Sequence, residues 1–344
     1  MALRILGSGG RSMRRAFCVL NPSAGGTMSA ALVPRIERAM EASGWEIQIC
    51  EVTEGTNIGE RVEEGVAHGF DTFIAAGGDG TIAAVAGALV GTDRLLGILP
   101  VGTGNVLARE LGIPMRIGRA LQVITDGHEV RKIDGMQVGD RHFFLNVGTG
   151  INARIMRDTD RGDKRRFGRV AYVWTGLKAL FDFQPHRFSL IVDGERSSHR
   201  ASEVFVANSG VLGDPSLRWE PSVQLDDGHL NVCIIRARTI LDYLRVGWRM
   251  LTGGHKREPG VECRLVDEDV TIQAERALPL QADGEFIGET PITVHVVPEA
   301  ASIAVPEKRG RPLGSLIGQP LATERTVDEV FPELNRRLRM IWRH

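Results

Sequence analysis

Three glycine-bearing loops in the first third of the chain have the composition of phosphate-binding turns. The central one, Gly77-Gly78-Asp79-Gly80-Thr81, follows a short apolar run and precedes an Ala- and Val-rich stretch. Glycine lets main-chain N–H groups approach a ligand closely, and a helix N-terminus offers unpaired N–H donors with a partial positive charge. The sequence therefore predicts a phosphate site at a turn between a strand and a helix.

The other two loops repeat this arrangement. Asn21-Pro22-Ser23-Ala24-Gly25-Gly26 follows the apolar run 16–20, and Pro100-Val101-Gly102-Thr103-Gly104-Asn105 follows the run 95–99. One glycine turn after a strand is usually only a turn, but three of them predict a common ligand site if their strands share one sheet edge. No GxxxxGK[ST] sequence is present, so this phosphate site lacks the lysine of a P-loop.

Carboxylates suited to proton transfer or metal binding lie both in the central loop and near the other end of the chain. They are Asp79, the pair in Asp226-Asp227-Gly228, and the pair in Asp283-Gly284-Glu285. Phosphoryl transfer to an alcohol needs positioning, neutralisation of charge by metal, and a group that takes the hydroxyl proton. Asp193-Gly194-Glu195 repeats the last tripeptide, and Asp-Gly is a common hairpin turn, so the tripeptide alone identifies no site.

The elements that must position these residues divide the chain into three parts. Residues 14–130 alternate apolar runs with amphipathic stretches, which predicts a parallel sheet covered by helices. The pattern over residues 131–305 predicts a mostly antiparallel β domain, interrupted by helical stretches at 168–181 and 239–252. Either its final strand or the tail that follows is expected to fold back onto the first domain. Its predicted strands are 143–147, 188–192, 203–207, 230–235, 270–273 and 292–297.

The third part, 306–344, predicts a linker followed by an amphipathic helix over 326–344. Two interpretations of this helix stay open: it docks on the body of the protein, or it contacts anionic lipid or a second copy in a homodimer. The basic stretch 154–169 is likewise either a solvated loop or a patch for anionic headgroups. The helix that follows it belongs to the core or lines an acyl-chain pocket.

The whole chain has the composition of a globular protein with no strong charge bias. Its 344 residues suffice for two domains, and its net charge of −1 gives no general attraction to nucleic acid. No apolar run approaches the roughly 20 residues of a membrane span, and the N-terminus lacks the apolar core of a signal peptide. We expect a cytoplasmic protein, attached at most peripherally to the inner face of the membrane.

The cysteines carry no recognisable motif. Cys18, Cys50, Cys233 and Cys263 lack CxxC spacing. This spacing predicts neither a zinc site nor a disulfide framework, and it fits a reducing compartment.

Taken together, these segments resemble the diacylglycerol kinase catalytic-domain family of soluble bacterial lipid kinases, which is related to sphingosine and ceramide kinases. The resemblance covers roughly residues 16–298 and rests on the order and spacing of short motifs. Besides the three loops and the two carboxylate segments, these are Thr53-Glu54, Ala108-Arg109 and Asn146-Val147-Gly148. The resemblance implies an N-terminal α/β domain like those of phosphofructokinase and NAD kinase, a C-terminal β-sandwich, and ATP in the cleft between them.

The resemblance also implies roles for individual residues. Glu285 matches the proton acceptor, and Asp283 is its neighbour, a link to metal or the base itself. For Asp79 we expect a contact to the catalytic Mg²⁺ or its water shell, the alternative being an ordinary turn residue between glycines. The remaining implied ligands are Asn21, Thr53, Gly77, Gly78, Asp79, Gly80, Thr81 and Thr103 for ATP, and Asp227 with the main-chain carbonyls of Gln224 and His229 for a second Mg²⁺.

One departure from the family pattern lies just after the central loop. Many members have Asn-Glu where this chain has Ala83 and Ala84, so a polar side-chain contact from that turn is lost. The sequence thus predicts an ATP- and Mg²⁺-dependent kinase for the hydroxyl of a diacylglycerol-like or sphingoid lipid. The alternatives are a kinase of a soluble substrate such as NAD, and a nucleotide- or lipid-binding relative without turnover, for which the two alanines are the hint.

Overall fold

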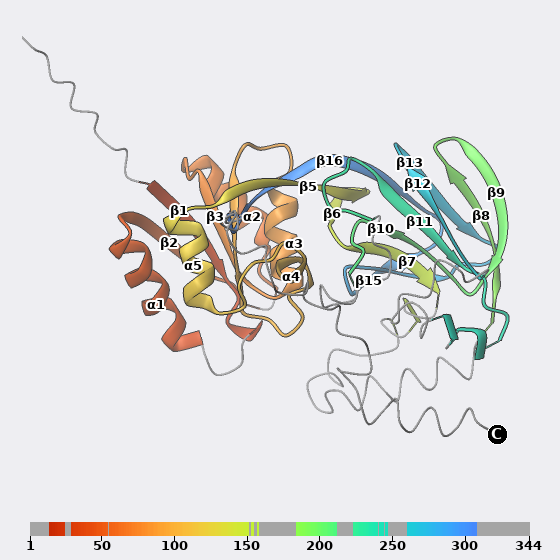
Figure 1. Cartoon of the computed structure of the whole chain (residues 1–344), viewed down its shortest axis with the longest axis horizontal. Helices are drawn as coiled ribbons and strands as arrows, with labels where there is room; N and C mark the ends of the chain where they lie inside the picture. Colours follow the sequence, from red (N-terminus) through yellow and green to blue (C-terminus); the bar gives the residue numbers. More distant parts are fainter. Residues whose placement is uncertain are drawn as a thin grey trace, which may run out of the picture.

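The computed structural model is elongated, with an α/β region at one end and packed β-sheets at the other (Figure 1). It describes residues 14–24, 29–53, 55–150, 184–211, 223–239 and 260–307, together with 153, 154, 157, 241–243, 245 and 246. The predicted helix at 168–181, most of the one at 239–252, the basic stretch beyond residue 157 and the C-terminal helix lie outside the described residues.

The N-terminal region is the parallel sheet that the alternating pattern predicts. Its strands lie in the order β2-β1-β3-β4 and pair in parallel. Buried side chains such as Phe73, Ile74 and Leu96 form the core between sheet and helices. The elements are β1 (Arg14–Leu20), α1 (Ser29–Ala42), β2 (Trp45–Glu51), α2 (Ile58–Ala67), β3 (Thr72–Gly77), α3 (Asp79–Ala88), β4 (Leu95–Pro100), α4 (Val106–Glu110) and α5 (Ile117–Asp126).

The C-terminal region is a sandwich of antiparallel strands, as expected. One sheet has the order β12-β11-β10-β7-β14-β15, and it packs on the β16-β13-β8-β9 part of the other. Apolar side chains that alternate along the strands, including Leu190, Val232 and Ile272, fill the space between the sheets. The strands are β5 (Glu129–Val138), β6 (Arg141–Phe143), β7 (Asn146–Gly150), β8 (His186–Val192), β9 (Glu195–Ala201), β10 (Glu203–Ala207), β11 (Leu230–Ile235), β12 (Val261–Val266), β13 (Asp269–Ala274), β14 (Pro279–Ala282), β15 (Glu285–Glu289) and β16 (Ile292–Val305).

Two long strands join the regions. β16 pairs with β13 in the sandwich and with β4 in the parallel sheet, and β5 runs antiparallel beside it (Figure 1). The last strand therefore returns to the first domain, which is one of the two predicted alternatives. Because one hydrogen-bonded sheet passes through both regions, the orientation of the second region relative to the phosphate loops is fixed by main-chain pairing.

The prediction of one strand over 143–147 was wrong. The segment is divided into β6 and β7, and the break falls at Phe144 and Leu145. The main chain at the break bonds outside the ladder: the Leu145 carbonyl accepts N–H groups from Asn208 and Ser209, and a carboxylate from a distant turn takes the N–H groups of residues 144–146.

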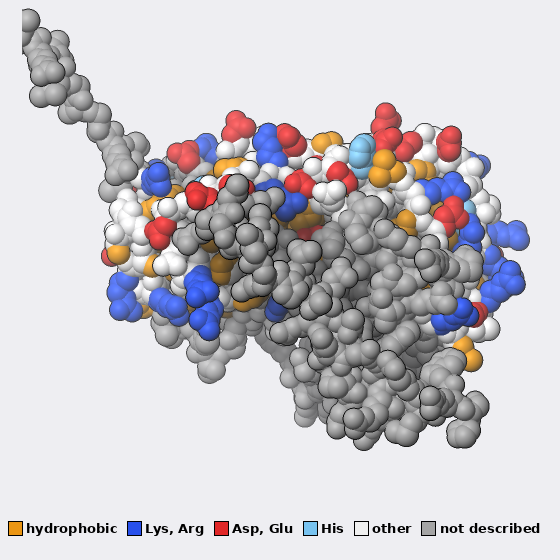
Figure 2. Space-filling model, in the orientation of Figure 1, with side chains coloured by type: hydrophobic (Ala, Val, Ile, Leu, Met, Phe, Trp, Pro, Cys, Tyr) orange, Lys and Arg blue, Asp and Glu red, His pale blue; other side chains and the backbone are white. Residues whose placement is uncertain are grey.

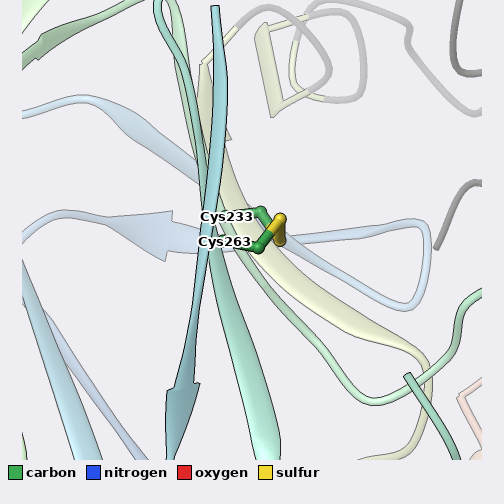
Figure 3. Close-up of a disulfide and its surroundings, with 2 residues drawn as sticks. All are labelled: Cys233 and Cys263. Carbon is green, nitrogen blue, oxygen red and sulfur yellow. A yellow bond between two sulfur atoms is a disulfide. The ribbon is translucent and has the colours of Figure 1, made fainter. Parts of the chain in front are cut away.

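The prediction of unpaired cysteines was wrong for Cys233 and Cys263, which form a disulfide between β11 and β12 (Figure 3). The two residues are 30 apart in sequence but directly opposite in the antiparallel register, with their Cα atoms 4.2 Å apart. Sequence spacing carries no information on that register. The cysteines consequently give no argument for a reducing compartment; Cys18 and Cys50 are free thiols.

The surface shows no broad region of one charge among the described residues in view. Acidic and basic side chains are interspersed over that surface (Figure 2). Of the helices in the described part of the chain, none has the length and apolar character needed to cross a membrane.

Candidate active site

The three phosphate-type loops follow three neighbouring parallel strands, β1, β3 and β4, and meet at one edge of the sheet. The Asn21 side-chain amide donates to Thr81 Oγ1 at 3.1 Å, which joins the first loop to the central one. The main-chain N–H groups of Val101 and Gly102 donate to the Gly77 carbonyl, which joins the third loop to it as well. Hydrogen bonds therefore join the described parts of the three loops to one another.

The close approach of the second and third loops depends on Gly102. A Cβ atom at this position would lie 2.4 Å from Gly78 Cα and 2.9 Å from Asn105 Oδ1. Asn105 adopts a left-handed conformation with φ 51° and donates to the Gly102 carbonyl at 2.6 Å, which completes the turn into α4. Even the smallest side chain at 102 must therefore push the two loops apart.

We expect Gly102→Ala to weaken ATP binding about tenfold or more, because relieving such a backbone clash typically costs about 1–3 kcal/mol. The measurement is calorimetric titration with a non-hydrolysable ATP analogue. Gly87→Ala, in α3, is the matched control, since its Cβ would lie at an ordinary 3.5 Å from His142 Cβ. Equal affinity of the Gly102→Ala variant and the unsubstituted chain would show that the loops do not bind nucleotide in this arrangement.

The N-terminus of α3 lies in the central loop. Gly78 is its N-cap residue and makes no side-chain cap hydrogen bond, because glycine has no side chain. Asp79 lies in that turn; its Oδ1 accepts the Leu107 N–H at 3.4 Å, and its Oδ2 lies so close to Gly104 that a Cβ there would be 2.7 Å away. The helix N-terminus favours an anion, while Asp79 connects the loop that would hold it to α4.

Glu285 approaches this helix N-terminus from the sandwich. A Cβ added to Gly80 would lie 3.4 Å from Glu285 Oε1, so the first turn of α3 and the start of β15 are in contact range. The other carboxylate oxygen, Oε2, lies 3.4 Å from Arg141 Nη2, and the Glu285 side chain is 50% exposed. The structure thus brings a solvent-accessible carboxylate of the second region against the glycine turn of the first.

Asp283 is held in a different way, because the main chain bonds both of its carboxylate oxygens. Its two oxygens accept three consecutive main-chain N–H groups, from Phe144, Leu145 and Asn146, at 2.8, 2.9 and 3.0 Å. Its own N–H donates to the Asn146 carbonyl. These bonds fasten the Asp283-Gly284 turn to the break between β6 and β7, and the residue that follows the turn is Glu285.

Burial of the Asp283 carboxyl raises its pKa to about 6. The three N–H donors act in the opposite direction, because they stabilise the charged form, and the negative charge of Asp79 raises the pKa further. Asp283 therefore lies close enough to Asp79 for the two negative charges to interact across the two regions.

The second Asp-Gly-Glu tripeptide adopts the same turn. Asp193 and Asp283 both have left-handed backbones, with φ 48° and 47°, and each is followed by a glycine at φ 84°. Asp193 likewise accepts three consecutive N–H groups, from residues 267–269. Asp193 is exposed, however, and its turn joins β8 and β9 at a position remote from the glycine loops in sheet order. The two tripeptides therefore form the same turn, and they differ in burial and in their distance from the glycine loops within the sheet.

The loop predicted to bind a second Mg²⁺ is anchored by a residue that the sequence did not single out. Buried Asp134, on β5, accepts the N–H of Gly228 at 2.7 Å and that of Glu299 at 2.9 Å. Asp226 makes a two-bond ion pair with Arg131, and Asp227 accepts the His229 N–H at 3.1 Å.

The carboxylates of this loop therefore already have protein partners. The exposed Gln224 lies at its start, and His229 Nδ1 lies 2.9 Å from an Asp267 carboxylate oxygen. Within the described ranges, no group of three His, Cys, Asp or Glu side chains is arranged to hold a metal ion. A magnesium ion here would have to compete with the Asp227 turn bond or bind through carbonyl oxygens.

The other predicted residues lie around the loops. Thr53 is exposed just after the end of β2, and its N–H donates to Thr56 Oγ1. Thr103 is exposed in the third loop. Ala83 and Ala84 are half-buried on α3, where Ala83 packs against the core. The two alanines thus leave the turn itself intact. Sequence reasoning missed Asp134 and Arg141, because a lone Asp in an apolar strand and an Arg after a Gly-Asp turn carry no motif.

Family models match both regions of the chain. Residues 15–138 match the diacylglycerol kinase catalytic domain, and residues 146–305 match the YegS C-terminal NAD kinase beta sandwich-like domain. A solved structure titled as a diacylglycerol kinase from Bacillus anthracis is similar in fold, with a TM-score of 0.71 and 23% identity over 87% of this chain and 99% of that one.

Curated relatives agree with these matches. A "Probable lipid kinase YegS-like" of Yersinia enterocolitica is 30% identical over 71% of this chain and 82% of its own length. The "Diacylglycerol kinase" of Bacillus subtilis is 28% identical over 81% and 92% of the two chains. An uncharacterized Synechocystis protein is 30% identical over 71% of this chain, which spans 57% of that relative's length.

Proposed function

We propose that this chain, which belongs to the diacylglycerol kinase catalytic-domain family, transfers the terminal phosphoryl group of ATP to the hydroxyl of a lipid. The observation that carries the proposal is the contact of Glu285 with the Gly80 turn. A proton acceptor on one region faces the phosphate-type turn on the other, and one continuous sheet holds the two in register.

In this proposal the polyphosphate lies along the three loops. The main-chain N–H groups of the Gly78–Gly80 turn and the dipole of α3 hold it, with Asn21, Thr53, Thr81 and Thr103 around it. The lipid hydroxyl lies beside Glu285, which accepts its proton as the new P–O bond forms. Asp283 keeps its place in the turn and sets the position of Glu285.

Carboxylate oxygens are ligands that Mg²⁺ prefers, and two carboxylates lie near the start of α3. Asp79 is in the first turn of this helix and Glu285 lies against Gly80, whereas the oxygens of Asp283 are already bonded to three main-chain N–H groups. We propose that Asp79 contacts the Mg²⁺ that binds with ATP. Bound there with ATP, Mg²⁺ would neutralise charge on the phosphates. We propose that Asp227 and the carbonyl groups of Gln224 and His229 bind a second, structural Mg²⁺.

A lipid acceptor is supported by the relatives that this chain resembles, which include a "Diacylglycerol kinase" and a "Probable lipid kinase YegS-like". The start of β15 also carries Phe286, a large apolar side chain that is 45% exposed. It follows Glu285 in the strand and therefore points to the opposite face. We propose that the protein works peripherally at the inner face of the membrane, where lipid substrates are found.

The experiment is transfer of labelled phosphate from ATP in mixed micelles. The acceptors are diacylglycerol, sphingosine and a total lipid extract, with NAD in a parallel reaction, and the products are separated and identified by mass. We expect label in a lipid and none in NAD. Label in NAD alone would replace the proposal with a soluble-substrate kinase, and nucleotide binding without any transfer would identify a non-catalytic relative.

A further inference from the structure

Carboxylates surround the start of α3. Asp79 lies in its first turn, Glu285 lies against Gly80, and buried Asp283 is close enough for its charge to interact with that of Asp79. The phosphate loops contain no lysine comparable to that of a P-loop. A phosphoryl group in transfer carries negative charge on its three outer oxygens, and kinases usually place a cationic side chain against them. A site of this kind therefore requires a protein cation close to the start of α3.

Arg141, the first residue of β6, meets this requirement by position. In the described part of the chain it is the cationic side chain in contact with Glu285, with Nη2 3.4 Å from Oε2. The opposite oxygen of the same carboxylate faces Gly80. The guanidinium group is therefore separated from the first turn of α3 by a single carboxylate.

The pairing of Arg141 with Glu285 leaves most of the guanidinium group available. It is one contact at 3.4 Å between side chains that are 57% and 50% exposed. By contrast, Arg131 binds Asp226 through two hydrogen bonds of 2.7 and 2.8 Å, which is a bidentate salt bridge. Arginine has five N–H donors in a rigid fork that matches phosphate oxygens, and the contact with Glu285 uses one of them.

The backbone that carries Arg141 is held firmly beside the phosphate loops. The guanidinium carbon lies 4.9 Å from the centre of the Phe143 ring, and Phe143 is buried in the sandwich core. His142, between them, packs against Gly87 of α3, and Figure 1 shows β6 beside this helix. The Phe143 ring and the paired strand both restrict the Arg141 side chain. Binding a ligand would therefore cost Arg141 little additional conformational entropy.

We propose that Arg141 is a catalytic residue that hydrogen-bonds to the transferred phosphoryl group. This inference rests on the proposed kinase function. The P–O bond to the lipid hydroxyl forms, the bond from the γ-phosphorus to the bridging oxygen of ADP breaks, and the hydroxyl proton goes to Glu285. Arg141 remains protonated throughout and contributes charge and orientation alone.

The test compares Arg141→Met and Arg141→Lys in the lipid transfer assay, with Arg196→Met as the control. Arg196 is exposed and follows the duplicate Asp-Gly-Glu turn. We expect kcat to fall about 10²- to 10³-fold in Arg141→Met, the usual effect of removing one transition-state donor. Arg141→Lys should recover part of the loss, and Arg196→Met should retain full activity. A kcat within about twofold of the unsubstituted chain in Arg141→Met overturns the proposal.

A double variant distinguishes a direct contact of Arg141 with the phosphoryl group from an effect of Arg141 on Glu285 alone. If Arg141 contacts the phosphoryl group, Arg141→Met must lower the residual rate of Glu285→Gln further, by about tenfold or more, since the two side chains then act on different atoms. If Arg141 only orients Glu285, the added substitution changes nothing, and the proposal is wrong.

A binding measurement keeps the inference testable even if no lipid is phosphorylated. The ratio of the dissociation constants for ADP and for a non-hydrolysable ATP analogue reports contacts to the terminal phosphate. Arg141→Met should reduce this ratio about tenfold, while Arg196→Met leaves it unchanged. An unaltered ratio in a folded Arg141→Met protein would contradict the contact, whatever the outcome of the transfer assay.

Discussion

Glu285→Gln is expected to lower the rate of phosphoryl transfer to lipid by about 10²- to 10⁴-fold, the usual contribution of a positioned general base. Glutamine keeps the size and hydrogen-bonding oxygen of the side chain but cannot take the hydroxyl proton. In the proposed binding mode Glu285 itself makes no contact with the polyphosphate, so the affinity for a non-hydrolysable ATP analogue should change little. Single-turnover transfer and calorimetry measure the two effects separately.

The duplicate tripeptide provides the control for this variant. Glu195 occupies the same place after the same turn, but it lies at the start of β9, away from the glycine loops. Glu195→Gln should therefore keep full activity. If Glu285→Gln turned over at the rate of the unsubstituted chain, Glu285 would not be the base.

Asp283→Ala is expected to lower both the stability and the activity of the protein. The substitution leaves the N–H groups of residues 144–146 without their acceptor, and uncompensated buried donors each cost about 1–3 kcal/mol. Because the buried carboxylate is itself costly to desolvate, we expect a net loss of about 2–4 kcal/mol in the free energy of unfolding. Transfer should fall as well, since the turn that places Glu285 is released.

Urea denaturation of Asp283→Ala beside Asp193→Ala measures this prediction. Asp193 makes three equivalent bonds at an exposed turn, where water can replace the carboxylate, so its removal should cost about 1 kcal/mol or less. Its activity should be unchanged. Equal loss of stability in the two variants would show that burial does not distinguish the turns. A stable, fully active Asp283→Ala protein would show that Asp283 neither stabilises the turn nor positions Glu285.

The features of the fold that depend on local pattern were predictable. Glycine-bearing turns after β1, β3 and β4 imply a shared sheet edge as soon as the strands are parallel, and the register of those strands brings Asn21 to Thr81 and Gly78 to Gly102. The sandwich followed from strands of alternating polarity with Asp-Gly turns between them. The glycine turns, the polarity pattern and the Asp-Gly turns each involve residues close together in the chain, so they can be recognised without knowing the fold.

The features that depend on long-range register were not predictable. The Cys233–Cys263 disulfide exists because β11 pairs with β12 in one particular alignment. The break between β6 and β7 depends on a carboxylate from residue 283, more than a hundred positions later in the chain. Likewise, Arg141 acquires a chemical context only when β6 lies between α3 and β15, which no spacing within the sequence indicates.

The most direct test is a crystal structure of the chain with a non-hydrolysable ATP analogue and Mg²⁺. We expect the polyphosphate to lie against the main-chain N–H groups of Gly78–Gly80, with the terminal phosphate between that turn and the Glu285 carboxylate. A nucleotide bound on another face of the parallel sheet, or a terminal phosphate beyond the reach of Glu285, would contradict it.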